Sequence, residues 1–162
     1  MQIEAKLQAK GLVLPQGAKL PPGITISFAW ARRHGNRIYL AGHGPLAPDG
    51  SPLGPFGKVP TEVSLEAARE AARATALSML ASLKRELGDL DRVTAWLMVS
   101  GMVNAEPSYG QTTNAINGFS DLILELYGPD IGQHARTAVG VAAFKYRFLG
   151  KKVEKGGAGN EQ

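Results

Sequence analysis

The sequence contains no cysteine among its 162 residues. This absence excludes disulfides, thiolate nucleophiles and cysteine-based zinc sites, and it is typical of proteins in a reducing compartment. No apolar stretch is long enough to span a membrane, and the first ten residues mix charged and apolar side chains, so we expect no secretory signal. The sequence therefore predicts a cytoplasmic protein without a membrane segment.

Sequence patterns for metal, phosphate or serine chemistry are also lacking. The three histidines match no metal-ligand spacing, so no metal is expected. The glycine-rich stretch 50–57 lacks the Gly-Lys-Ser/Thr pattern and the strand–turn–helix setting of a phosphate loop, and no other cofactor is expected. No histidine and aspartate set accompanies the serines, so a serine nucleophile is not indicated; the serines considered are Ser27, Ser100, Ser108 and Ser120.

The charge balance is modestly basic. The net charge is +4, and part of the excess lies near the end of the chain. A balance of this size favours the approach of acidic ligands. Nucleic acid is not the expected partner, because no stripe of lysine and arginine interleaves with aromatic residues in the body of the chain.

The length favours one domain, and a hydrophobic fraction of 44% is enough for one core. We divide the chain into an N-terminal helix with a Pro/Gly-rich arm (1–23), a single domain (24–150) and a basic, flexible tail (151–162). Hydrophobic periodicity predicts helices over 3–12, 64–87 and 111–127, and strands over 24–32, 37–42, 92–102 and 137–144.

These elements follow the order β-β-α-β-α-β after a short helix. The fold class is therefore α+β, with two helices on one face of a single mixed sheet in which 92–102 is a central strand. No helix remains to cover the other face of this sheet. Because an uncovered apolar face usually packs against another subunit, we expect an oligomer.

Arg136 is the strongest candidate for chemistry. It opens an apolar strand-like run, His134 to Val141, just after a helix has ended at Gly128-Pro129. Burying an unpaired arginine beside a core costs free energy. Its planar guanidinium group is well shaped to hold a carboxylate or phosphate by two hydrogen bonds. Two interpretations are open: a clamp for a small carboxylate, or a structural ion pair with Asp121 or Glu125.

Three further residues are candidates for a functional or positioning role. His43 follows a predicted strand end, where a loop can line a pocket. His134 lies close to Arg136 and either helps to bind an anion when protonated or has no role. Asn117 lies inside the second long helix beside Gly118, an unusual place that suggests a side-chain hydrogen bond to a neighbouring loop.

Together, these segments resemble the YjgF/RidA family, whose members are also known as L-PSP endoribonucleases. The resemblance covers about residues 24–144 and matches one less-characterised branch. It rests on the following stretches: Gly35-Asn36-Arg37-Ile38-Tyr39-Leu40-Ala41-Gly42 with Gly44-Pro45, Leu87-Gly88-Asp89-Leu90-Asp91-Arg92-Val93, Val103-Asn104, Ile116-Asn117-Gly118-Phe119-Ser120-Asp121-Leu122 and His134-Ala135-Arg136-Thr137-Ala138-Val139-Gly140-Val141.

The resemblance implies a chorismate-mutase-like fold and a homotrimeric barrel with three clefts between subunits. In the deaminase members, an arginine at the position of Arg136 holds the carboxylate of a 2-imino or 2-enamino acid, and water releases a 2-keto acid and ammonia without metal or organic cofactor. The implied ligand is a small carboxylate or imino acid. Arg136 is then the catalytic residue, and the implied substrate-binding set is Phe28, Ala41, Gly42, His43, Asn117, His134 and Arg136.

The sequence departs from the deaminases at three positions of this site. Phe28 stands where they have tyrosine, and Ala41 stands where they have the serine before Gly42. Their glutamate aligns with Lys151 without gaps, and Glu154 fits only after a shift in register. Losing a positioned proton-transfer group typically costs about 10²–10⁴-fold in rate. The alternative is therefore a non-catalytic small-molecule-binding or regulatory protein of the same fold, and RNA binding or cleavage ranks third.

Overall fold

The structure is a computed structural model, and it describes residues 2–143. Its elements run in the predicted order, with a short 3-10 helix η1 after the first long helix. Their bounds are α1 Gln2–Ala9, β1 Ala31–His34, β2 Arg37–Leu40, α2 Leu65–Leu87, η1 Leu90–Arg92, β3 Met98–Asn104, α3 Thr112–Gly132 and β4 Ala135–Val141. The predicted tail and the residues Lys151 and Glu154 lie outside the described part.

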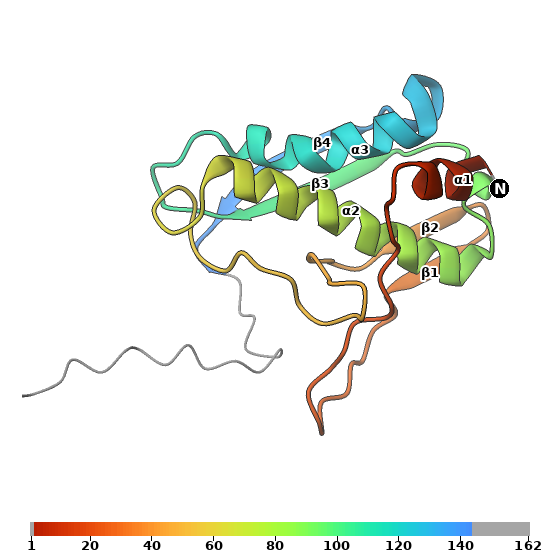
Figure 1. The fold of residues 1–162 in the computed structure, drawn as a ribbon, viewed down its shortest axis with the longest axis horizontal. Coiled ribbons are helices and arrows are strands. Elements are labelled where there is room, and N and C mark those ends of the chain that lie inside the picture. Colours follow the sequence, from red (N-terminus) through yellow and green to blue (C-terminus); the bar gives the residue numbers. More distant parts are fainter. Residues whose placement is uncertain (1, 144–162) are drawn as a thin grey trace, which may run out of the picture.

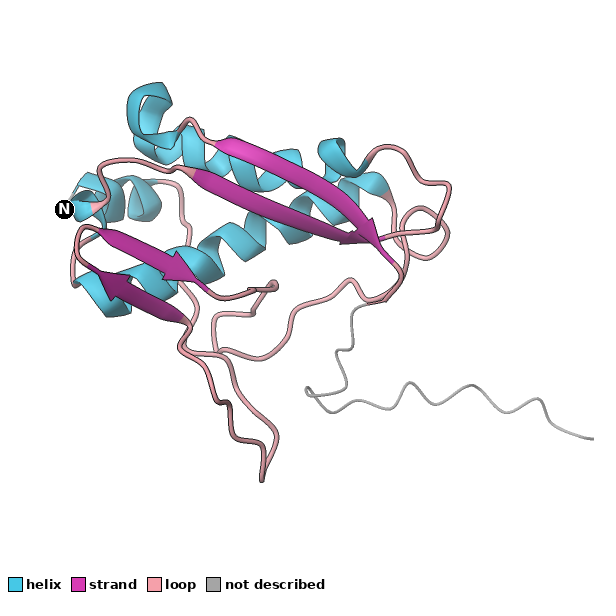
Figure 2. Ribbon diagram, turned by 180° about the vertical axis from the view of Figure 1, so that it is seen from behind, coloured by secondary structure: helices cyan, strands magenta, loops and turns pink. Residues whose placement is uncertain are grey.

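The two long helices form one layer and the strands form the other. Helices α2 and α3 pack against each other, and both strand pairs lie on the same side of them (Figures 1 and 2). Strand β1 pairs antiparallel with β2, and β3 pairs parallel with β4, with Val99 opposite Arg136. The α+β class and the two helices on one side agree with the sequence prediction.

Local signals set the bounds of α2, as the sequence predicted. The Oγ of Ser64 accepts a hydrogen bond from the backbone N–H of Ala67 at 3.1 Å, which caps the first turn. At the other end, Gly88 adopts a left-handed conformation with φ 77°, which closes the last turn onto Lys84. Between these caps the helix buries one apolar face against α3 and the strands.

The core lies between the helices and the strands. Leu80 from α2 and Leu122, Ile123 and Leu126 from α3 are fully buried in it. The α2–α3 contact is close because Gly118 has no side chain: a Cβ atom there would lie 2.0 Å from the backbone oxygen of Arg69. The backbone of α3 therefore rests directly on α2, which fixes the orientation of the helix face that turns toward β4.

The strand predicted over 24–32 is wrong for most of its length. Only residues from Ala31 onward pair with β2, and the preceding segment forms no strand. The turn at Gly35-Asn36 sets a register of four residue pairs, and one further hydrogen bond joins the N–H of Ala41 to the oxygen of Trp30. An alternating pattern needs a neighbouring strand to become a ladder, and 24–30 has none among residues 2–143.

The single mixed sheet is also wrong in the described part of the chain. There, β1–β2 and β3–β4 form separate two-stranded sheets, and β2 does not pair with β3. The predicted strand 92–102 begins only at Met98: η1 includes Arg92, and residues 93–97 form no strand. It is also not buried on both faces, because its side chains alternate between exposed and buried. A largely apolar cleft of about 920 Å³ lies between β2 and β3.

The last helix and strand also shift by a few residues. A kink at Gly128, with φ 74°, interrupts α3 near the predicted stop at Gly128-Pro129, but a further turn carries it to Gly132. Strand β4 then runs from Ala135 to Val141, and Phe144, the predicted end of this strand, lies outside the described residues.

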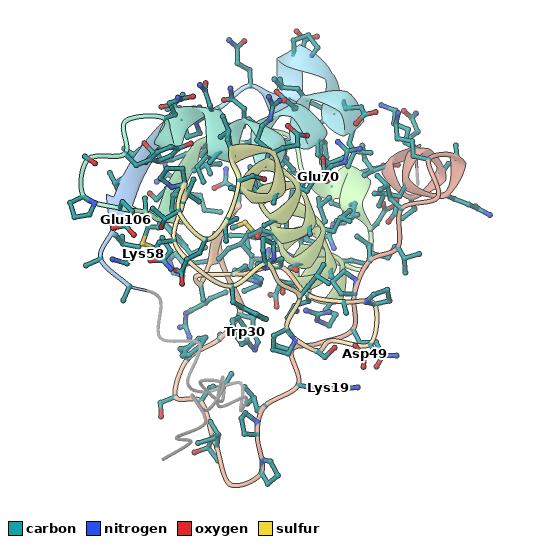
Figure 3. The ribbon with its side chains drawn as sticks, turned by 60° about the vertical axis from the view of Figure 1, so that its left-hand side comes forward. Lys19, Trp30, Asp49, Lys58, Glu70 and Glu106 are labelled. Atoms are coloured by element: carbon teal, nitrogen blue, oxygen red, sulfur yellow. The ribbon has the colours of Figure 1, made fainter. Side chains whose placement is uncertain are left out.

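The N-terminal arm is fastened to the long loop after β2. Lys19 Nζ lies 2.6 Å from a carboxylate oxygen of Asp49, and the two side chains meet in Figure 3. The other carboxylate oxygen of Asp49, Oδ1, accepts a hydrogen bond from the backbone N–H of Ser51, which forms the predicted turn. Within residues 2–143, no helix is both long and apolar enough to cross a bilayer.

Candidate functional site

An open cavity of about 400 Å³ lies between α3 and the start of β4. Polar side chains from both elements line it, together with two apolar side chains. The lining residues are Thr113, Ser120 and Leu124 from α3, and Gln133, His134, Arg136 and Ala138 from the segment that forms β4. The volume is that of a small-molecule site.

Arg136 points from β4 toward α3 and is half-buried there. Its Nη1 donates to Ser120 Oγ at 2.8 Å, and its Nη2 donates to Asn117 Oδ1 at 2.9 Å and to the backbone oxygen of Thr113 at 3.4 Å. All three acceptors are neutral. They orient the guanidinium group in the cavity without cancelling its charge.

The ion pair that was the alternative for Arg136 is not formed. Asp121 instead pairs with Arg69 at 3.1 Å, and Glu125 pairs with Arg73 at 3.2 Å and with Lys10. Within residues 2–143, Arg136 has no carboxylate partner. A charged guanidinium without a counter-ion, beside an open cavity, attracts an anion.

Ser120 and His134 form a hydrogen-bonded pair beside Arg136. The distance from Ser120 Oγ to His134 Nε2 is 2.9 Å, and His134 Nδ1 lies 2.7 Å from the backbone oxygen of Gly132. A carbonyl oxygen only accepts, so Nδ1 carries a proton, and in the neutral ring Nε2 accepts the proton of the Ser120 hydroxyl. The ring also packs edge-on against Phe119, with centroids 6.2 Å apart.

The sequence does not indicate Ser120 as a nucleophile, although the polar residues of α3 carry a signal that places it at this site. Thr113, Asn117 and Ser120 recur at four- and three-residue spacing, which places them on one face of a helix that is otherwise apolar toward the core. A polar stripe at helical spacing needs polar partners. Here the partners are Arg136 and His134, which are too far along the chain for the pattern itself to identify.

The other candidate residues lie in a different place. Ala41, Gly42 and His43 line the cleft between β2 and β3, which shares no lining residue with the cavity at Arg136. Phe28 is 53% exposed and contacts the ring of Trp30. Within one chain, the structure therefore brings Arg136, Asn117 and His134 together and leaves Phe28 and the other three residues apart from them.

His43 fastens the segment after β2 to α2. Its Nδ1 lies 2.7 Å from the oxygen of Ala41, and its Nε2 lies 2.8 Å from Ser82 Oγ, which also accepts a hydrogen bond from Arg85. Burial lowers the pKa of His43, and the nearby charge of Arg85 lowers it further. The folded protein therefore favours the neutral form of the ring.

We expect this histidine to make stability fall as the pH falls. The unfolded chain takes up a proton at the ordinary histidine pKa of 6.5, whereas folded His43 takes it up only at lower pH, so the folded state loses stability below that value. Urea unfolding at about pH 7.5 and 5.5 measures the loss. His43→Gln should reduce it, and His34→Gln, at an exposed position, should not. Equal losses in wild type and His43→Gln would contradict the assignment.

Three carboxylates, Glu4, Asp89 and Asp91, lie close enough together to suggest a cation site. Each already accepts hydrogen bonds. Glu4 accepts from Lys84, Asp91 accepts from the first backbone N–H groups of α1, and Asp89 caps η1. These contacts explain the cluster as the fastening of α1 to η1.

Comparison with known proteins gives close matches along most of the chain. No family model matches. Protein TCP17 of Trypanosoma cruzi is 33% identical over 145 residues, which are 90% of this chain and 87% of that protein. Protein Atu1372 of Agrobacterium tumefaciens, whose structure is described as one with unknown function, is 30% identical with a TM-score of 0.77, over 91% of this chain and 86% of that one.

A second solved structure comes from Shewanella oneidensis MR-1 and is described as a "putative endoribonuclease". It is 26% identical to this chain, with a TM-score of 0.81, and the match covers 92% of this chain and 94% of that one. Both solved structures therefore match this chain over about nine tenths of its length.

Proposed function

The chain belongs to the same family as protein TCP17 of Trypanosoma cruzi and has a RidA-like fold, and from this premise we propose that it binds a small carboxylate at Arg136. The best-supported reaction is the hydrolysis of a 2-imino or 2-enamino acid to a 2-keto acid and ammonia. Such a reaction needs a carboxylate clamp and a placed water, because the imine is already reactive.

One observation carries this proposal: within residues 2–143, the Arg136 guanidinium group lies at an open cavity without a carboxylate partner. Ser120 and Asn117 hold its two terminal nitrogens at hydrogen-bond distance but bring no negative charge. The fork still has unused N–H groups, since a guanidinium has five. A small carboxylate supplies the missing charge and fits a cavity of about 400 Å³.

We further propose that three copies of the chain assemble and complete the site. The sheet face that turns away from the helices exposes several large apolar side chains, which is unusual for a monomer. These are Met98 (56% exposed), Met102 (49%) and Val139 (49%). Association through this face would bury these side chains. As the family resemblance implies, we propose that Ala41, Gly42 and His43 of a neighbouring copy complete the Arg136 site.

A non-catalytic binding protein is the second candidate, and particular residues favour it. Phe28 and Ala41 carry no hydroxyl group where the deaminases that the sequence resembles have tyrosine and serine. Such a cleft still binds a small acid. RNA cleavage, which the name of the Shewanella protein suggests for that protein, has less support here, since none of the described residues that line the cavity is a Phe, Tyr or Trp suited to base stacking.

A coupled assay tests the reaction. A pyridoxal-phosphate lyase generates 2-aminoacrylate in the cuvette, and ammonia or pyruvate release is followed with wild type and with Arg136→Ala. We expect wild type to accelerate release and the variant to lose at least about 100-fold of that acceleration. No acceleration by wild type would leave the non-catalytic binding protein as the better account.

A further inference from the structure

Ser120 helps to orient Arg136, but its hydrogen bond to His134 has no assigned role in the carboxylate clamp. Both side chains are half-buried and both line the cavity. The Gly132 carbonyl fixes the proton on Nδ1, so that Nε2 faces the Ser120 hydroxyl at 2.9 Å. On its other side, Ser120 Oγ accepts a hydrogen bond from Arg136 Nη1 at 2.8 Å. A cation and a basic nitrogen thus polarise one hydroxyl group.

A second serine–histidine pair in the same molecule makes the same contacts but differs from Ser120–His134 in the accessibility of its hydroxyl group. Ser82 and His43 meet at 2.8 Å, with Arg85 donating to the same hydroxyl and a backbone carbonyl on Nδ1. However, Ser82 is only 3% exposed, so no ligand reaches its oxygen. The Ser82 pair fastens a loop. The Ser120 pair has the same contacts, but its hydroxyl opens onto a cavity.

We propose that His134 is the proton acceptor of the Arg136 site and that the Ser120 hydroxyl passes protons between this histidine and the ligand. This inference rests on the proposed binding of a 2-imino acid at Arg136. Imidazole is the side chain best suited to take up and release protons near neutral pH. The pair would thus serve the proton-transfer role that Phe28 and Ala41, without hydroxyl groups, cannot serve.

The proton balance of the reaction fits such a pair. When the water oxygen bonds to the imine carbon, the C=N electron pair moves to nitrogen. The proton that the water loses passes through Ser120 to His134 Nε2 and then to that nitrogen. When the C–N bond breaks, the proton of the new hydroxyl follows the same route, leaving a 2-keto acid and ammonia. Ser120 and His134 end the cycle unchanged, and no other reactant is needed.

The test separates turnover from binding. We expect His134→Ala to lower kcat by about 10²–10⁴-fold while the dissociation constant for pyruvate changes by less than about threefold. Ser120→Ala should lower kcat over the same range, and it also removes one hydrogen bond that orients Arg136. Arg136→Ala should instead weaken pyruvate binding. His34→Gln, at the exposed end of β1, is the matched control and should leave both quantities unchanged.

Added imidazole provides a readout that a structural role would not move. In His134→Ala, imidazole in solution should restore part of kcat, and Ser120→Thr, which keeps a hydroxyl, should retain more activity than Ser120→Ala. Undiminished kcat in His134→Ala would overturn the inference, and so would a covalent adduct on Ser120, which would make it a nucleophile. Pyruvate binding without turnover in wild type also overturns it, whereas absence of binding refutes the proposed function itself.

Discussion

Gly118→Ala is expected to destabilise the protein by about 3 kcal/mol or more, the range of severe overpacking. The added Cβ would lie 2.0 Å from the backbone oxygen of Arg69 and 2.7 Å from its carbonyl carbon. Backbone atoms of a helix cannot rotate away as a side chain does, so α2 and α3 must separate. Urea unfolding of both proteins measures the difference in the free energy of unfolding.

The direction of this effect makes the test sharp. In a helix interior without such a contact, glycine to alanine stabilises by up to about 1 kcal/mol, so the expected sign is the reverse of the usual one. Gly110→Ala is the matched control, because nothing lies within 4 Å of the Cβ position there. We expect it to change stability by less than about 0.5 kcal/mol. A Gly118→Ala protein as stable as wild type would show that the two helices are not in backbone contact.

Arg136→Ala is expected to weaken pyruvate binding by about 100-fold or more, because removing one partner of a partly buried charge pair typically costs about 2–5 kcal/mol. Arg136→Lys keeps the charge but loses the two-pronged geometry of the guanidinium group. Its pyruvate affinity should lie between those of wild type and Arg136→Ala. The fold should survive, since Arg136 contacts only neutral groups within residues 2–143. Calorimetric titration gives the affinities, and circular dichroism confirms that each variant is folded.

A second arginine variant controls for the loss of charge. Arg33→Ala removes one positive charge from the exposed β1–β2 hairpin, where the Nε of Arg33 bonds only to the neighbouring Gly35 oxygen. We expect its pyruvate affinity to equal that of wild type. A similar loss in Arg33→Ala and Arg136→Ala would indicate a general electrostatic attraction rather than a clamp.

The parts of the fold that the sequence predicted well are those with local causes. Ser64 and Gly88 end α2 through hydrogen bonds within a few residues, and Gly35-Asn36 makes the hairpin turn in the same way. The strand over 24–32 failed for the opposite reason. A ladder depends on a partner elsewhere in the chain, and the alternation of Ile24, Ile26 and Phe28 does not specify one.

The candidate site shows the same contrast between features with local causes and features that depend on distant parts of the chain. Arg136 was identifiable, because a charged residue at the start of an apolar strand needs a partner. Its actual partners depend on how α3 lies on α2, which the missing side chain of Gly118 controls. Ser120 is not recognisable from the sequence, because its histidine partner lies 14 residues further on, beyond the kink at Gly128. The sequence feature that does indicate this site is the polar stripe on one face of α3, formed by Thr113, Asn117 and Ser120.

A titration of wild type with pyruvate and, in parallel, with pyruvamide tests the central claim most directly. The two ligands have nearly the same shape, but only pyruvate has the carboxylate that Arg136 is proposed to bind. We predict saturable binding of pyruvate, with one ligand per chain, and at least about 100-fold weaker binding of the amide. Equal affinities for the two, or no binding of pyruvate, would contradict a carboxylate clamp at Arg136.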